Sequence, residues 1–389
     1  MDFAFTEDDR AFGRRFAELL DEKLPADWQG FFAEDREALA FTREFCRDLG
    51  RAGLLTVSWP AEYGGQGAGV WKQTLLRELM TASGEPRGPQ YMNLNYIGPL
   101  IMKFGTAEQK DRFLPPMARG EVIWTQGFSE PDAGSDLAAL RTRAVDHGDH
   151  FVVTGQKIWS SYADSPADWN LLLVRTNPDA GRRRGMSVLL VDMTSPGITV
   201  RPIESMGGWH EINEVFYDEV RVPRDCLLGP LDEGWGVIGS GLTLERIGIP
   251  RYARAQRVVE RLCDHVRATG RAGEPDVRQK LADLRVRCEA AKLLAYRAIS
   301  LVAAGANPAA EASTARIHAT LLEQAVGHVG LEILGASGRL GSPADQHAPL
   351  HGLVKQQWVH NIPATIGAGT LEIQKNIVAQ TALGLPRSR

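Results

Sequence analysis

The hydrophobic pattern of this chain changes twice, and that change constrains the fold more than any other feature of the sequence. From Glu7 to about Gly120, apolar residues recur every three or four positions, as in Phe12 and Phe16, which indicates amphipathic helices. After Gly120 the chain consists of short β-rich runs separated by glycine, proline, asparagine and aspartate. The helical spacing returns from Trp235 onward. We therefore expect a mostly helical α+β protein in which a small antiparallel sheet lies between two helical regions.

Turn and cap signals place individual elements within this order. The double proline Pro115-Pro116 is expected to end the first helical region, whereas Asn307-Pro308 and Gly335 are typical of a helix start and a helix stop. The sequence has neither a βαβ alternation nor Gly-x-Gly-x-x-Gly after a strand, which disfavours a Rossmann fold. We predict strands over 151–154, 171–174, 187–191 and 214–222, and helices over 251–269, 277–304, 308–334 and 370–383.

Composition disfavours several classes of function. A formal charge of -4 and a pI near 6.2 leave no basic surface for nucleic acid. No run approaches the roughly 18 apolar residues of a membrane span, and the acidic N-terminus does not resemble a signal peptide, so we expect a cytoplasmic protein. The four cysteines lack CxxC spacing, which indicates packing residues. Pro349 between His347 and His351 disfavours a zinc-binding helix, so we expect no metal.

The segment Trp124–Asp136 contains residue types that suit a flat cofactor ring. Its sequence is WTQGFSEPDAGSD. An isoalloxazine ring needs close approach of the backbone and hydrogen-bond partners along one edge, which serine and glycine permit and tryptophan can flank. Because proline, aspartate, glycine and serine also dominate turns, SEPDAGSD alone would equally indicate a β-turn. The sequence around Trp159 on a predicted strand favours the flavin site.

These motifs, taken in order, resemble the acyl-CoA dehydrogenase family over nearly the whole chain. The resemblance implies FAD as cofactor, an acyl-CoA substrate, and an N-terminal helical domain over 1–120, a middle β-domain over 121–230 and a C-terminal four-helix bundle over 231–389. It also implies electron-transfer flavoprotein as a partner and a homotetramer or homodimer. The motifs are SWPAEYGG at 58–65, FGTAEQK at 104–110, SEPDAGSD at 129–136, VTGQKIWSS at 153–161, VRVP at 220–223 and GAGTLEIQ at 367–374.

The resemblance assigns roles to residues in several parts of the chain. The implied substrate contacts are Ser135, Thr243, Arg246 and Gly369. Trp159 is also open to a second interpretation, because most tryptophans are buried in a core. The implied flavin contacts are Gln126, Phe128, Ser129, Gly134, Ser135, Trp159, Ser160, Ser161, Thr370 and Glu372.

The reaction that the resemblance implies needs one carboxylate as a base. In this family a glutamate removes the α-proton of the thioester while the β-hydrogen leaves as hydride to the flavin, which gives a trans-2-enoyl-CoA. The step requires a carboxylate whose pKa is raised by desolvation and a polarised thioester carbonyl. The position that most often holds this glutamate is Ala368 here, and alanine cannot take a proton.

A second position for the base is present in this chain. Some members, isovaleryl-CoA dehydrogenase among them, place the base on the first helix of the last domain in a Leu-Glu-Arg context, and this chain has LTLER at 242–246. We therefore predict that Glu245 is the catalytic base. The alternative is that Glu245 only forms a structural ion pair with an arginine such as Arg246 or Arg251.

Two positions depart from the family pattern around FAD. Where many members carry an arginine that meets the pyrophosphate, this chain offers Arg271 or Arg278, and the sequence does not distinguish them. Near the adenosine half of FAD, Glu332 stands in place of a glutamine, and an acid there would oppose a pyrophosphate. A related chain in a hetero-oligomer would supply the missing contacts, as in the bacterial α2β2 members that act on sterol side-chain CoA esters.

Three other functions share much of this evidence. A flavin-dependent oxidase on the same fold would pass electrons to oxygen, and an acyl-carrier-protein dehydrogenase would take its thioester from a phosphopantetheine arm. A non-catalytic subunit would account for Ala368 and the altered FAD contacts, but Ser129, Trp159 and Glu245 argue against it. Oxygen uptake, a competition between CoA and carrier-protein substrates, and the flavin absorbance of the purified protein separate these alternatives.

Overall fold

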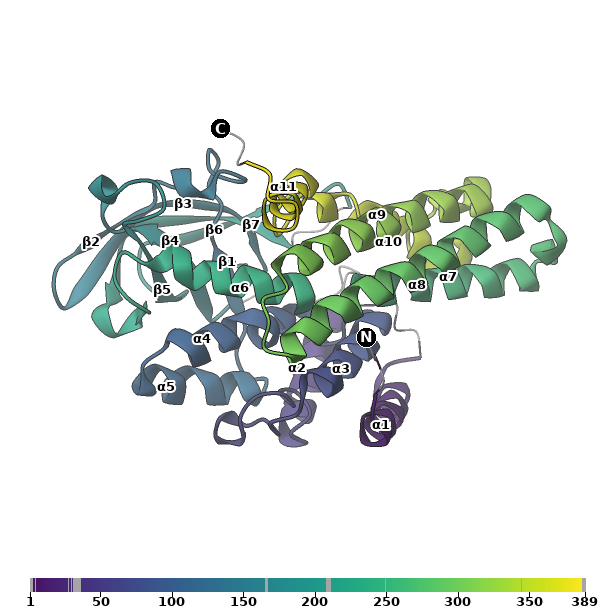
Figure 1. The fold of residues 1–389 in the computed structure, drawn as a ribbon, viewed down its shortest axis with the longest axis horizontal. Coiled ribbons are helices and arrows are strands. Elements are labelled where there is room, and N and C mark those ends of the chain that lie inside the picture. The colour runs from purple at the N-terminus through teal and green to yellow at the C-terminus, as the bar shows by residue number, and fades with distance from the viewer. Residues whose placement is uncertain are drawn as a thin grey trace. The chain divides into compact units, whose positions relative to one another are not determined.

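The structure is a computed structural model. It describes residues 3, 5–26, 28, 30, 36–164, 167–207, 211–248, 250–343 and 345–386, with the backbone alone at 36, 37 and 242–248. The chain forms two compact units, each built from separate stretches of sequence (Figure 1). Unit 1 comprises Met1–Asp35, Ala68–Pro86 and Arg246–Arg389, and unit 2 comprises Arg36–Gly67 and Arg87–Glu245.

A mixed sheet forms the centre of unit 2. In the described residues its strand order is β6-β7-β3-β2-β4-β5-β8, and β1 pairs with β4 beside this path. Residues 171–174 of β4 and 188–191 of β5 are all fully buried, as expected for apolar runs covered on both faces. The strands are β1 (Trp124–Gly127), β2 (Arg143–Asp146), β3 (His150–Ser161), β4 (Trp169–Arg175), β5 (Met186–Asp192), β6 (Ile198–Ile203), β7 (Ile212–Pro223) and β8 (Leu227–Leu228).

The observed sheet corrects the predicted one in two respects. All four predicted strands are present as β3, β4, β5 and β7, but β3 is longer than the apolar run that predicted it, because polar residues such as Gln156 continue its pairing with β7. The expected antiparallel pairing is present for β2–β3, β3–β7, β4–β5, β5–β8 and β6–β7, whereas β1 and β2 each run parallel to β4. The short strands β1, β2 and β8 offer too few positions for an alternating pattern to predict them.

A helix of unit 2 packs on the start of the segment Trp124–Asp136, which has the residue types of a flavin site. The fully buried Trp124 of β1 meets Phe113 of α5 edge-on and stacks on Trp169 of β4. The prediction that Pro115-Pro116 ends the helical region is wrong, because α5 continues through both prolines. The prolines cannot donate to the carbonyls of Asp111 and Arg112, four residues earlier, and the helix ends two residues after the second proline, at Ala118. The helices are α2 (Arg36–Arg51), α4 (Gly98–Phe104), α5 (Ala107–Ala118) and α6 (Gly234–Gly248), which ends beyond unit 2.

Three long helices, α7 (Arg251–Ala268), α8 (Pro275–Ala303) and α9 (Ala309–Leu334), pack against one another in unit 1 (Figure 1). α10 (Leu353–His360) and α11 (Leu371–Thr381) pack on α9, while α3 (Val70–Ala82) packs on α7 and α8 and carries α1 (Glu7–Lys23). The four helices predicted for this region are therefore confirmed. Gly335 ends α9 with a φ of 63°, as its role as a stop signal predicts.

The core of unit 1 lies between α7, α8, α9 and α10. It includes Leu262, Leu284, Leu322 and Val354, each at most 1% exposed. Burying each such side chain contributes about 1.5–3 kcal/mol. The four cysteines are free, and three of them are buried, in agreement with a packing role. Among the helices of the described ranges, none is long and apolar enough to cross a membrane.

Candidate functional site

The segment Trp124–Asp136 and the strand that carries Trp159 lie side by side in unit 2. The Ile158 N–H donates a 2.9 Å hydrogen bond to the Ser129 carbonyl. Thr125 Oγ1 donates a 2.7 Å bond to the Ser161 carbonyl. These two contacts bring together the predicted flavin residues of 126–129 and 159–161, which lie about thirty positions apart in the chain.

A buried ion pair joins the same two segments. Lys157 Nζ lies 2.8 Å from Glu130 Oε1 and donates a 3.0 Å hydrogen bond to the Phe128 carbonyl. The Glu130 carboxylate also accepts from the backbone N–H groups of Arg141 and Thr142, at 2.6 and 2.8 Å. The sequence patterns do not predict this pair, because lysine and glutamate are almost never fully buried unless paired.

The two members of the pair keep opposite charges near neutral pH. Burial lowers the pKa of Lys157 to about 8, and the neighbouring Glu130 carboxylate limits that shift. Burial by itself would raise the pKa of Glu130, but the Lys157 charge and the hydrogen bonds to the carboxylate outweigh it, so the pKa is lowered. The pair therefore ties the loop after β1 to β3 by a charge-assisted contact within the sheet domain.

Trp159 lies at an irregularity in β3. The pairing of β3 with β7 shifts register between Lys157 and Ser160, and Trp159 has a φ of 64°, which is uncommon for a bulky residue. Trp159 is 54% exposed, so the interpretation of this tryptophan as a core residue is wrong. Ser160 is 1% exposed, and its hydroxyl has no hydrogen-bond partner among the described residues. The bulge therefore turns the Trp159 side chain outward and leaves the Ser160 hydroxyl buried. The role of Ser160 as a flavin contact stays a prediction.

The loop after Ser129 is a tight turn with an open backbone. Glu130 and Ala133 exchange two backbone hydrogen bonds of 3.0 Å each. Gly134 and Ser135 follow this turn and are exposed, and a Cβ added at Gly134 would meet nothing within 4 Å. The packing of the protein therefore does not require glycine at 134, and the bare backbone leaves room for a ligand to approach. Together with the exposed Trp159, this arrangement fits a flat ring such as that of FAD.

A loop before α11 holds the second group of predicted residues, in unit 1. Ala368 and Gly369 have φ values of 54° and 92°. Gln374, which is fully buried, donates to the carbonyls of Ala368 and Gly369 at 3.2 and 3.3 Å. Thr370 then begins α11: its Oγ1 accepts a 3.2 Å bond from the Ile373 N–H, which leaves the hydroxyl hydrogen available for a ligand. Glu372 is exposed in the first turn of α11.

Replacing Thr370 by alanine is expected to lower the free energy of unfolding by about 1 kcal/mol, because the helix cap is lost. Thr370→Ser keeps the capping oxygen and is expected to retain most of that stability. Urea unfolding of the two variants and the wild type measures the difference. Equal stability of Thr370→Ala and Thr370→Ser would contradict the capping role.

The predicted base lies on α6. Its helical backbone continues through positions 243, 245 and 246 to Gly248. The side chains of Thr243, Glu245 and Arg246 lie outside the described residues. The role of Glu245 as base and the substrate contacts of Thr243 and Arg246 therefore stay predictions.

The residues at the positions that depart from the family pattern around FAD differ in the side chains and carbonyls that they contact. Arg271 makes hydrogen bonds of 2.7 and 2.8 Å to Glu274 and one of 2.6 Å to the Ile333 carbonyl. Arg278 is exposed near the start of α8, so of the two arginines it is the one better placed to meet an anion. Lys280 pairs with Glu332 at 3.1 Å, which reduces the negative charge that would oppose a pyrophosphate.

Potential metal ligands are scattered through the described part of the chain. Among the described residues, no group of three or more histidine, cysteine, aspartate or glutamate residues could hold a metal ion. His351 has a φ of 52° at a kink, so the His347/His351 spacing is not that of an α-helix.

Comparison with known proteins gives matches along the chain. Residues 6–121, 125–220 and 232–383 match the family models of the N-terminal, middle and C-terminal domains of acyl-CoA dehydrogenases. Acyl-CoA dehydrogenase FadE26 of Mycobacterium tuberculosis is 34% identical over 397 residues, covering 94% of this chain and 97% of that protein.

Two solved structures are similar over the whole length of this chain. The Tcur3481-Tcur3483 steroid ACAD matches with a TM-score of 0.91 and 34% identity, covering 100% of both chains. The ChsE4-ChsE5 complex from Mycobacterium tuberculosis matches with a TM-score of 0.88 and 33% identity, again covering 100% of both chains.

Proposed function

This chain belongs to the acyl-CoA dehydrogenase family, and on that premise we propose that it catalyses FAD-dependent α,β-dehydrogenation of an acyl-CoA thioester to the trans-2-enoyl-CoA. Because the chain belongs to this family, the protein is an oxidoreductase of the acyl-CoA dehydrogenase type. The observation that carries the proposal is the exposed Trp159 beside the open turn at 133–135, with the Lys157–Glu130 pair holding the two together.

Residues of β1, of β3, of the loop after β1 and of the start of α11 would hold FAD. Gln126 of β1, with Phe128 and Ser129 of the loop after it, would line the ring. Gly134 and Ser135 would leave room for the ring and the thioester, and Trp159 would contact the ring. Ser161, Thr370 and Glu372 would add polar contacts, the Thr370 hydroxyl as a donor. Bound FAD would supply the acceptor for the hydride of the β-carbon.

The base acts on the α-carbon of the same substrate. The Glu245 carboxylate would take the α-proton, and the electron pair of the broken Cα–H bond would form the new double bond as the hydride leaves the β-carbon. Thr243, Arg246 and Gly369 would position the thioester so that these two hydrogens face their acceptors. Exclusion of water would raise the pKa of the carboxylate toward neutrality.

The proposal includes the partners of the reaction. Electrons would pass from the reduced cofactor to an electron-transfer flavoprotein in the cytoplasm. A hetero-oligomer with a related chain is the favoured assembly over a homodimer or homotetramer, because the ChsE4-ChsE5 relative is a complex and because Ala368 and Glu332 depart from the family pattern. Similarity to a steroid ACAD adds steroid side-chain thioesters to the substrates worth testing.

A screen of linear, branched and steroid side-chain acyl-CoAs with an artificial electron acceptor tests the proposed reaction. We expect bleaching of the flavin absorbance and formation of the enoyl-CoA with at least one class. Oxygen uptake at the same rate would instead indicate an oxidase, and a preference for a carrier-protein thioester would indicate the carrier-protein dehydrogenase. A colourless protein that does not take up FAD, alone or with a co-expressed related chain, would indicate a non-catalytic subunit.

Trp159→Ala is expected to raise the Kd for FAD about tenfold, because an aromatic contact with the ring is lost. Since Trp159 is half exposed, the free energy of unfolding of the apoprotein should change by less than about 0.5 kcal/mol. The matched control is Trp124→Ala, which removes a fully buried tryptophan and should cost about 3–5 kcal/mol. Flavin fluorescence titration and urea unfolding measure the two quantities. An unchanged Kd in Trp159→Ala would count against the proposed ring site.

A further inference from the structure

A short π-helical turn, Asn93–Ile97, lies against the start of β1 in unit 2. The carboxamide of Asn93 is fully buried. It accepts a 3.0 Å hydrogen bond from the Trp124 N–H and donates one of 2.7 Å to the Val122 carbonyl. π-Helical turns are rare and occur frequently at functional sites. Asn93 therefore fixes such a turn beside the strand that begins the segment Trp124–Asp136.

A second side chain of the π-helical turn, that of Tyr96, also bonds to β1. Tyr96 is 2% exposed, and its hydroxyl donates a 2.5 Å hydrogen bond to Oε1 of Gln126, thirty positions later in the chain. Gln126 lies on β1 and is one of the residues that the sequence assigns to the flavin site. The buried tyrosine therefore restrains the side chain of a predicted flavin contact.

This hydrogen bond determines which end of the Gln126 carboxamide is left for a ligand. A carboxamide has a carbonyl oxygen that accepts and an amino group that donates two hydrogens. Tyr96 occupies the oxygen, whereas the Nε2 group makes no hydrogen bond within the part of the chain that the structure describes. Gln126 is only partly buried, so this amino group is accessible. Because the last torsion of a glutamine side chain is broad, either end would face a ligand if Tyr96 did not hold it.

We propose that Tyr96 is a positioning residue of the flavin site, which holds the Gln126 Nε2 group as a hydrogen-bond donor to the edge of the FAD ring and thereby favours the reduced cofactor. The inference rests on the proposed function and names a residue that sets its reduction potential. The reduced ring carries more negative charge than the oxidised ring, so an N–H donor at its edge stabilises the reduced form more. A carbonyl oxygen at the same place would have the opposite effect, because it would repel that charge.

Tyr96→Phe removes the hydroxyl and keeps the buried ring, so the Gln126 carboxamide becomes free to turn. We expect the preference of the site for reduced over oxidised FAD to fall about tenfold, which for a two-electron couple is a fall of about 30 mV in the reduction potential. Reductive titration against a dye of known potential measures this quantity in the FAD-loaded protein, in the assembly in which it purifies. A potential that is unchanged or higher in Tyr96→Phe would overturn the proposal.

A double-mutant cycle shows whether Tyr96 acts through Gln126. Gln126→Met removes both polar ends of the side chain and should also lower the reduction potential. Adding Tyr96→Phe to Gln126→Met should then cause no further change, because no carboxamide is left to orient. An equal fall in potential with and without the glutamine would show that the tyrosine hydroxyl acts by another route, and the proposal would be wrong.

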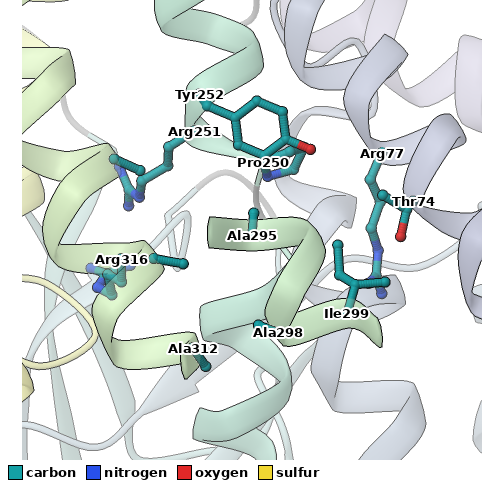
Figure 2. Close-up of a pocket in the computed structure, with 12 residues that line it drawn as sticks. Thr74, Arg77, Pro250, Arg251, Tyr252, Ala295, Ala298, Ile299, Ala312 and Arg316 are labelled. Atoms are coloured by element: carbon teal, nitrogen blue, oxygen red, sulfur yellow. The ribbon is translucent and has the colours of Figure 1, made fainter. Parts of the chain in front are cut away.

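Tyr252→Phe is the matched control for the loss of a buried tyrosine hydroxyl. Tyr252 is 3% exposed, lines a small cavity within unit 1 (Figure 2), and donates its hydroxyl hydrogen to the Glu78 carboxylate. This variant should lose stability in urea and keep the potential of the wild type, and a shift as large as that of Tyr96→Phe would contradict a specific role for Tyr96. Absence of acyl-CoA turnover by a wild type that holds FAD would count against the proposed function, whereas the potentials would still decide on the role of Tyr96.

Discussion

Replacement of Glu245 by glutamine is expected to lower kcat/KM for acyl-CoA dehydrogenation by about 10²- to 10⁴-fold, the usual contribution of a general base. Glutamine has nearly the shape of glutamate but cannot accept the α-proton, so the variant should keep its yellow flavin. A steady-state assay with an artificial acceptor measures the rate, and the flavin absorbance of the same sample measures its FAD content. Activity within a few-fold of the wild type would place the base elsewhere.

The other position for the base supplies a matched control. Adding Ala368→Glu to the Glu245→Gln variant is expected to restore part of the activity, whereas adding Ala368→Gln is not. Ala368 already has a φ of 54°, so glutamate there would bear about the same backbone strain as the alanine. Recovery with glutamate alone would show that the missing group is a carboxylate within reach of the α-carbon.

Lys157→Met is expected to lower the free energy of unfolding by about 3–5 kcal/mol, as for a buried pair that loses one partner. The Lys157 side chain is fully buried, and the Glu130 carboxylate, 9% exposed, would lose its countercharge. The loop that carries Ser129 should also lose its tie to β3, so the Kd for FAD should rise with the loss of stability. Urea unfolding and a flavin fluorescence titration measure the two effects.

Two variants separate the burial of charge from the removal of a side chain. Lys157→Met combined with Glu130→Gln removes both charges and is expected to recover much of the lost stability. Arg182→Met breaks an ion pair with Asp136 in which both side chains are more than half exposed, and it should change the stability by less than about 1 kcal/mol. If Lys157→Met were no more destabilising than Arg182→Met, the buried pair would not be what holds the two segments together.

How well the sequence predicts each element depends on the length of the element. α7, α8 and α9 repeat their apolar pattern over several turns, and their predicted ends lie within two residues of the observed ones. β1 and β2 have four residues each, too few to establish a period. The parallel pairing of Trp124 in β1 with Trp169 in β4 joins residues far apart in the chain, and no local pattern encodes it.

The candidate site also has features that the sequence predicts and features that it does not predict. SEPDAGSD, VTGQKIWSS and the LTLER segment are local strings, so the family, the flavin-facing residue types and the proposed base could be inferred from the sequence alone. The outward direction of Trp159 and the inward direction of Ser160 could not, because they follow from a bulge in the pairing of β3 with β7. The tie between Lys157 and Glu130 likewise requires the loop after β1 to fold onto β3.

By itself, the sequence determined the order of the elements, membership of the acyl-CoA dehydrogenase family and the residue types of the flavin site, since local periodicity and contiguous motifs carry all three. Only the tertiary structure decided which polar side chains are buried as a pair and that the Trp159 side chain faces outward. Burial and charge pairing depend on residues distant in sequence, whereas the hydrophobic pattern records only which face of one element is apolar.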